Sequence, residues 1–353
     1  MRRALRKLLL SVLLLWMSGC SVHEFPQDRG ERVPYELNLD FSTELPLYLE
    51  IDATKDGESK GPGESHDLRY IIKAYRANVG REQSRIEDTT FVFTRSEFKN
   101  LNYKAPLLLP EGDYVFRVWA DYVSAGTTTD KYYDTRDYAE IILANRDPHE
   151  GNNDFRDAFR GYAEGTVLNP KLYSEDEAAQ IKNETTASMV RPLGKFQFIS
   201  TDIEVFIQRI IEMMKEQGMS SDEATMQNID LNDYRIVFRY NAFMPCSYNI
   251  FTDKPADAWT GVWFESRMST LSETEVSLGF DYVFVNGSES TLSITVEVYD
   301  KDGQKLSTTQ PIQVPVVRSK LTVVRGEFLT SEASGGVSIN PGYDGDDYNV
   351  EIQ

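Results

Sequence analysis

The chain has 353 residues and a formal net charge of −19, with 41% apolar and 12% aromatic residues. This length exceeds what one hydrophobic core usually fills and predicts two domains, and the apolar content excludes general disorder. The negative surface repels phosphate groups, so we expect no nucleic-acid partner and no electrostatic docking on anionic lipid.

The first twenty residues have the pattern of an export signal. Four basic residues within positions 2–7 precede the apolar run 8–16, which is too short to span a bilayer as a helix. Ser18 and Gly19 then place small residues before Cys20, and this stretch resembles a bacterial lipobox. We predict removal of the signal peptide, diacylglycerol and palmitate attachment at Cys20, and anchoring in the outer membrane at the cell surface. An ordinary cleaved signal that happens to contain a Cys is the alternative.

Removal of residues 1–19 leaves 334 residues and changes the net charge from −19 to −23, since four positive charges are lost. Two or three acyl chains together hold a protein firmly on a membrane, whereas one does not. With Cys20 acylated, Cys246 is the remaining thiol of the chain, so no internal disulfide is expected. Cys246 is more typical of a buried small apolar residue than of a nucleophile.

The first half of the mature chain has the alternation of β-strands. Residues 20–34 are polar and contain two prolines, which predicts a tether, and residues 35–165 follow as the first domain. Apolar residues there recur with a period of two and are separated by turn signals such as 110–113. The predicted strands are 35–41, 68–75, 90–94, 105–109, 114–122, 138–143 and 155–162.

Residues 166–188 are predicted as the connection to a second domain, 189–353, which contains the one clear helix, 202–217. Thr201 and Glu204 have the spacing of a capping box, and the helix carries an apolar stripe expected to pack on the second domain. Asn286-Gly287 predicts a hairpin, and Asp302-Gly303 predicts a turn. The predicted strands are 189–199, 234–240, 262–265, 276–285, 291–299, 312–317, 321–328 and 348–352.

The predicted fold class is therefore all-β, mainly strand with one helix, arranged as two tandem immunoglobulin-like sandwiches.

No motif in the chain indicates catalysis. The three His residues, His23, His66 and His149, lie in predicted loops or the tether and lack the spacing of a zinc helix. The Asp-rich fragments 300–303 and 344–347 resemble parts of calcium loops but lack the closing Glu, so they are predicted turns. We expect a non-enzymatic protein with no catalytic residue, no metal and no cofactor.

Four aromatic residues are candidate ligand contacts. Trp259 and Trp263 stand among other aromatics, and Tyr132 and Tyr133 flank a Gly- and Thr-rich loop. Aromatic ring faces of this kind bind sugars, although in β-sandwiches most of them belong to the core.

Two segments resemble strands of a known family. Residues 189–198, Met-Val-Arg-Pro-Leu-Gly-Lys-Phe-Gln-Phe, are similar to its Leu-x-Arg-x-Val-Ala-Lys-Val strand, and residues 316–326 are similar to its late Arg-Asn-x-x-Tyr strand. The family is that of the fimbrillin-like lipoproteins of Bacteroidales, which includes the type V pilus (Mfa-like) proteins and their anchoring subunits.

The resemblance implies a surface structural or adhesive role, transthyretin-like sandwiches, and joining to other fimbrillin-like subunits by strand donation. A pilus anchor, accessory subunit or adhesin is thus the leading hypothesis. The alternative is a glycan-binding surface lipoprotein, and a hydrolase with scattered carboxylates is a third.

In the pilin branch of the family, a protease cuts after an Arg beyond the first strand. Here the first Arg after that strand is Arg69, which lies in a predicted strand where a protease has poor access. Arg29 and Arg32 precede the strand. We therefore expect this chain to keep its first strand and to act as an anchor or accessory subunit.

Overall fold

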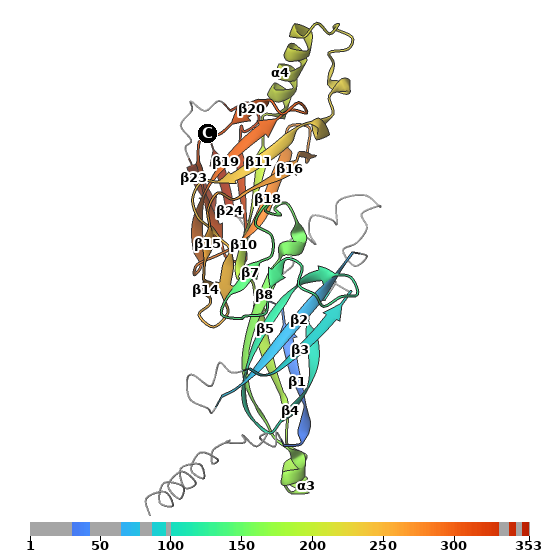
Figure 1. Cartoon of the computed structure of the whole chain (residues 1–353), viewed down its shortest axis with the longest axis vertical. Helices are drawn as coiled ribbons and strands as arrows, with labels where there is room; N and C mark the ends of the chain where they lie inside the picture. The colour runs from blue at the N-terminus through green and yellow to red at the C-terminus, as the bar shows by residue number, and fades with distance from the viewer. Residues whose placement is uncertain are drawn as a thin grey trace, which may run out of the picture.

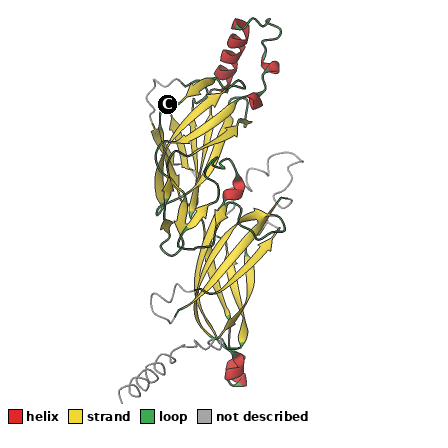
Figure 2. Ribbon diagram, in the orientation of Figure 1, coloured by secondary structure: helices red, strands yellow, loops and turns green. Residues whose placement is uncertain are grey.

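The computed structural model describes residues 30–42, 65–77, 87–96, 100–331, 339–343 and 348–352. Cys20, the signal peptide and most of the tether lie outside these ranges. Two β-rich halves are stacked end to end, with helix α4 (Ile203–Glu216) at one tip and the short α3 (Glu175–Ala178) at the other (Figures 1 and 2). In the part of the chain that is described, no helix has both the length and the apolar content needed to cross a bilayer.

The N-terminal half is one curled sheet of seven strands. The order across it is β3 (Glu87–Arg95), β2 (His66–Arg76), β5 (Gly112–Ser124), β8 (Ala158–Val167), β9 (Glu184–Val190), β1 (Arg32–Asp40) and β4 (Tyr103–Pro110). The sheet curls so that β1 faces β5 across the core, where the rings of Tyr35 and Phe116 stack 5.5 Å apart. Its end strands meet at Phe93 and Tyr103, whose ring centroids also lie 5.5 Å apart.

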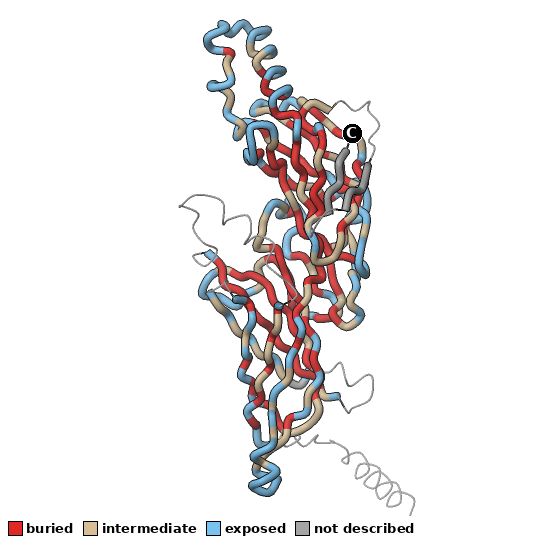
Figure 3. The backbone as a smooth tube through the Cα atoms, turned by 180° about the vertical axis from the view of Figure 1, so that it is seen from behind, coloured by how far each residue is buried: buried red, intermediate tan, exposed pale blue. Residues whose placement is uncertain are grey.

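The C-terminal half is a sandwich of two sheets. One sheet has the order β17 (Ser269–Thr270), β18 (Val276–Phe284), β10 (Leu193–Ser200), β22 (Leu321–Gly326), β24 (Tyr348–Ile352) and β23 (Ile339–Tyr343). The other has the order β16 (Trp263–Arg267), β11 (Arg235–Tyr240), β19 (Glu289–Tyr299) and β20 (Lys305–Thr308), and β21 (Ile312–Val317) also pairs with β19. Phe198 and Phe238 pack edge to face between the two sheets at 5.4 Å. The predicted all-β fold with one long helix is confirmed, and the buried residues, red in Figure 3, are concentrated along the strands of both halves.

The two halves meet at a shared region that we call the joint. Here β7 (Ile141–Leu143), from the first half of the sequence, pairs with β13 (Ser247–Asn249) from the second. β6 (Tyr133–Asp134) and β14 (Lys254–Pro255) extend this pair into a small sheet, and β12 (Met244–Pro245) pairs with β15 (Ala258–Trp259) beside it. Strand pairing thus links the halves directly, in addition to the chain connection.

Ion pairs, one of them fully buried, also cross the joint. Asp157, which precedes β8, binds Arg191 at 2.8 Å, and both side chains are almost fully buried. Asp154 accepts from Lys195 of β10 at 2.6 Å. The Asp253 carboxylate accepts from Arg160 of β8 and from Arg318, at 2.8 and 2.9 Å. These charged contacts fix the two halves relative to each other.

The predicted boundary between the halves differs from the observed one. Segment 166–188 was expected as a connection, but it contains a 3₁₀ turn (Pro170–Leu172), α3 and most of β9, and β9 belongs to the N-terminal sheet. The predicted strand 189–199 is in fact the end of β9 and then β10, in different sheets. The chain crosses between the halves at residues 191–192, next to the buried Arg191.

The expected hairpin at Asn286-Gly287 is wrong. Gly287 does adopt a positive φ of 78°, but the strands on either side, β18 and β19, belong to opposite sheets of the sandwich. The turn therefore arches between sheets. In contrast, β19 and β20 do pair with each other, so the turn predicted at Asp302-Gly303 joins a true hairpin.

Helix α4 packs through its first half, as its stripe predicts. Ile203, Phe206, Ile207 and Ile210 are buried, and Phe206 meets Tyr234 edge to face at 5.2 Å. The N-cap is Asp202 and not the expected Thr201, and the Asp202 side chain does not cap the helix. Its carboxylate instead accepts from the backbone N–H and hydroxyl of Thr330, at 2.8 and 2.7 Å, and so holds the helix base to the segment after β22.

Candidate functional site

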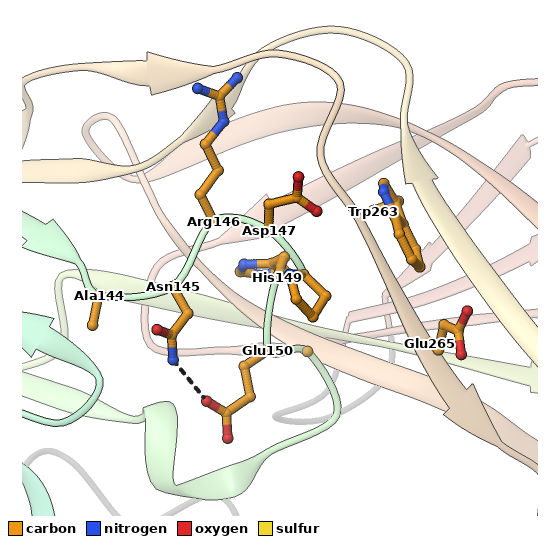
Figure 4. A pocket seen from close by; sticks show the side chains of 10 residues that line it. Ala144, Asn145, Arg146, Asp147, His149, Glu150, Trp263 and Glu265 are labelled. Carbon is orange, nitrogen blue, oxygen red and sulfur yellow. Dashed lines mark hydrogen bonds between the residues drawn. The ribbon is translucent and has the colours of Figure 1, made fainter.

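The joint encloses the most promising site, a cavity of about 700 Å³ that we call the joint cavity. Its walls are the loop 144–151, which follows β7, and the side chains of Trp263 and Glu265 on β16 (Figure 4). One wall thus comes from the segment after the N-terminal sheet and the other from the C-terminal sandwich. Its size is in the range of small-molecule sites in proteins.

The loop 144–151 is held against the C-terminal sandwich by contacts at Gly151 and at the adjoining Asn152. Gly151 lies against the ring of Phe264, and a Cβ at this position would overlap that ring. The backbone N–H of Asn152 donates to the carbonyl of Phe280 at 2.8 Å. Arg146 and His149 form an isolated β-bridge around a cis Asp147-Pro148 peptide. Larger side chains at 151 would therefore displace the cavity wall.

His149 lies on the wall of the cavity and is only 4% exposed. Its Nε2 lies 2.6 Å from Asp281 Oδ2, and the Tyr240 hydroxyl donates to the same carboxylate. Arg156 forms an ion pair with the other oxygen of Asp281. His149 Nδ1 has no hydrogen-bond partner among the described residues.

Asp281 is the centre of this buried network. Burial by itself would raise the pKa of its carboxyl group, but the positive charge of Arg156 and the hydrogen bonds with His149 and Tyr240 outweigh that effect. The pKa of Asp281 lies below its ordinary value as a result. The carboxylate therefore stays charged and keeps the His149 ring in place.

The charged side chains around the cavity have partners of their own. Glu150 accepts from the amides of Asn145 and Asn153, at 3.3 and 2.9 Å. Glu265 pairs with Arg235 at 2.5 Å. Arg146 donates to the carbonyl of Thr260 at 3.2 Å. The walls thus carry carboxylates at positions 147, 150 and 265 and one guanidinium at 146.

The four candidate aromatic residues have different positions. Trp263 is half-buried and lines the joint cavity, as a ligand contact would. Trp259 is half-buried beside it, with the Arg146 guanidinium 5.8 Å from its ring centroid, and does not line the cavity.

Tyr132 and Tyr133 were expected as ligand contacts, but both are core residues, 5% and 0% exposed. The Tyr132 hydroxyl bonds His66 Nε2 at 2.7 Å, and the Tyr133 hydroxyl donates to the Arg156 carbonyl. Their ring faces are covered, so these two expectations are corrected.

The sequence did not single out His149, Glu150 or Glu265 as site residues. His149 lies in a loop as predicted, but its burial depends on Asp281, which is 132 positions away and gives no local signal.

Cys246 is buried as expected, and burial, together with the negative charge of Asp257, raises the pKa of its thiol to about 11. In the described ranges, no group of three His, Cys, Asp or Glu side chains is placed to hold a metal ion.

His66 makes the fold sensitive to acid. It begins β2, is 7% exposed and stacks on Phe155 with ring centroids 3.6 Å apart. Burial and the nearby charge of Lys131 lower its pKa from 6.5 to about 4. The unfolded chain therefore binds a proton between pH 6.5 and 4 that the folded chain does not, so stability falls as the pH falls through this range.

We expect His66→Gln to reduce this loss, as measured by urea unfolding at pH 7, 5.5 and 4.5. An unchanged pH dependence in the variant would show that His66 is protonated in the folded protein.

A family model described as a family of unknown function, DUF6562, matches residues 30–353, which is nearly the whole chain. The chain belongs to the DUF6562 family. This DUF6562 protein has no match among proteins of curated function.

Solved structures similar to this chain include a fimbrial anchor protein and candidate adhesion and polysaccharide-binding proteins. The fimbrial anchor protein Mfa2 of Porphyromonas gingivalis is 11% identical, with a TM-score of 0.39, over 79% of this chain and 82% of that one. A candidate cell adhesion protein from Bacteroides eggerthii is 10% identical, with a TM-score of 0.42, over 92% and 95%. A candidate polysaccharide-binding protein from Bacteroides thetaiotaomicron is 11% identical, with a TM-score of 0.40, over 78% and 79%.

Proposed function

We propose that this DUF6562 chain is a non-enzymatic surface lipoprotein that serves as a fimbrial anchor, accessory subunit or adhesin. In this proposal Cys20 carries the lipid, the outer membrane holds it at the cell surface, and the two stacked halves project from it. The proposal is supported by the lipobox-like stretch before Cys20 and by the strand motifs in 189–198 and 316–326.

The observation that best supports a role as anchor or accessory subunit is the position of β1. This strand pairs antiparallel with β4 from Arg32 to Leu39 and parallel with β9 from Glu36 to Asp40, so it is bonded on both sides. Its inward side chains Val33, Tyr35, Leu37 and Leu39 are buried. Burial of each such side chain stabilises the fold by about 1.5–3 kcal/mol. Because β1 lies between β4 and β9, its loss would expose a long apolar groove and forfeit this stabilisation.

The surroundings of Arg69 also favour retention of β1. Arg69 lies in β2, is 2% exposed, and pairs with Asp121 and Asp130, both at 2.7 Å. A protease needs an extended, accessible backbone, and the backbone of Arg69 is paired with strands on both sides. Cleavage at Arg69 would therefore require β2 to unfold.

A Cys20→Ala strain tests the anchor role. The chain should shift from the cell fraction to the culture medium, and any fibre attached through it should be released as well. A chain that stays with the cells, together with unchanged attachment of fibres, would contradict the proposal.

Glycan binding is the second candidate function, and one observation favours it. Trp263 presents an aromatic side chain to the joint cavity among polar groups, which is the composition of many sugar sites. An adhesin could combine this site with the surface role above.

A further inference from the structure

We propose that the joint cavity binds an uncharged oligosaccharide. The inference rests on the glycan-binding candidate above and specifies its site and its ligand class. It does not depend on whether the chain anchors a fibre.

Trp263 supplies the apolar wall. It pairs with Arg239 across β11 and β16, and that guanidinium lies 6.0 Å from the centroid of the Trp263 ring. The backbone pairing holds the ring on a strand and not on a loop, so its position is fixed before a ligand arrives. Sugar rings have apolar C–H faces that pack on such an aromatic surface.

His149 supplies a buried polar group that lacks a partner. Its Nε2 is occupied by Asp281, while Nδ1 finds no partner among the described residues although the ring is buried. Buried polar atoms are nearly always hydrogen-bonded, so this nitrogen is available to bond a polar group placed in the cavity. A hydroxyl group satisfies such a nitrogen because it can either donate or accept.

The charges on the wall select against anionic sugars. Asp147, Glu150 and Glu265 place three carboxylates around the cavity against the single guanidinium of Arg146, and Glu265 is itself paired with Arg235. A uronate or sulfate group would face this excess of negative charge, whereas hydroxyl groups can donate to the same carboxylates. Neutral hexose and N-acetylhexosamine units therefore fit the site.

Ligand binding should stabilise the fold. The loop 144–151 is held on the C-terminal sandwich through His149 and Gly151, and Trp263 belongs to that sandwich. A ligand that contacts both walls binds only while the loop keeps this position, so it stabilises the folded chain by mass action.

The test uses the purified mature chain with Cys20 replaced by Ser. An array should contain cellotriose, mannotriose and chitotriose as neutral probes beside trigalacturonate and a sulfated disaccharide, and the strongest ligand is then titrated by calorimetry. We expect at least one neutral probe to bind at least about tenfold more tightly than both acidic probes. The bound probe should also raise the melting temperature of the chain.

Variants locate the binding. Trp263→Ala should lower the affinity for the neutral probe about tenfold or more, and Trp263→Phe should lower this affinity less. Asp147→Lys, at an exposed position of the loop, should reduce the discrimination against trigalacturonate. Tyr173→Ala is the matched control, because Tyr173 is an exposed aromatic next to α3, at the tip of the N-terminal half and away from the joint (Figure 1).

The proposal is overturned if none of the neutral probes binds, if an acidic probe binds best, or if Trp263→Ala and Trp263→Phe bind like the unchanged protein while their melting temperatures are normal. Release of fibres from the Cys20→Ala strain would still support the anchor role in each of these cases, so the two proposals fail separately.

Discussion

Asp281→Ala is expected to lower the free energy of unfolding by about 3–5 kcal/mol, because removal of one partner of a buried ion pair leaves the other charge buried without compensation. Asp281 is 1% exposed and binds Arg156, His149 and Tyr240. Without its carboxylate, the Arg156 guanidinium loses its ion pair and the His149 ring loses the bond on Nε2. We expect both the joint and the C-terminal sandwich to lose stability.

Chemical unfolding of the mature chain, followed by tryptophan fluorescence, measures this loss. Lys104→Ala is the matched control, since its ion pair with Glu36 is at the surface and should contribute little to stability. If Asp281→Ala were as stable as Lys104→Ala, the network at the joint would not stabilise the fold.

Ile207→Asp is expected to have an effect of similar size at the other end of the molecule. Ile207 is 7% exposed and belongs to the stripe by which α4 packs on the C-terminal sandwich. Loss of a buried aliphatic side chain costs about 2–5 kcal/mol, and a carboxylate in its place must also lose its hydration. We expect the C-terminal half to unfold or to melt far below the unchanged protein.

Val205→Asp provides the control on the same helix. Val205 is 53% exposed, so the same substitution there should change stability by about 0.5 kcal/mol or less. Equal melting temperatures for Ile207→Asp and Val205→Asp would mean that the stripe does not pack on the sandwich.

The sequence predicts strands such as β1 because one face is buried and the other is partly solvated. In β1, the alternation of Tyr35, Leu37 and Leu39 with polar residues corresponds directly to the alternation of buried and partly exposed side chains. The apolar stripe of α4 is predicted in the same way, because its apolar residues recur with the helical period of 3.6 residues. These patterns are local, so a single sequence contains them.

Pairing between strands is not local and was predicted less well. Asn286-Gly287 specifies a tight turn, but whether the next strand returns to the same sheet or crosses to the other depends on the packing of the whole sandwich. For the same reason segment 184–190, which was expected within the connection and the second domain, is instead a strand of the N-terminal sheet.

The site was predicted only in part. Trp263 was singled out from its residue type and does line the joint cavity, while Tyr132 and Tyr133 have the same chemistry and are core residues. Their hydroxyls find partners in His66 and the carbonyl of Arg156, which are distant in sequence. The difference between a ligand contact and a core aromatic thus depends on long-range neighbours.

The measurement that tests the central claim most directly is the N-terminus and intact mass of the protein taken from its native cell surface. The account predicts a mature form that begins at an acylated Cys20 and retains β1. A mature form that begins between Lys55 and Arg69, without the lipid and without β1, would contradict it.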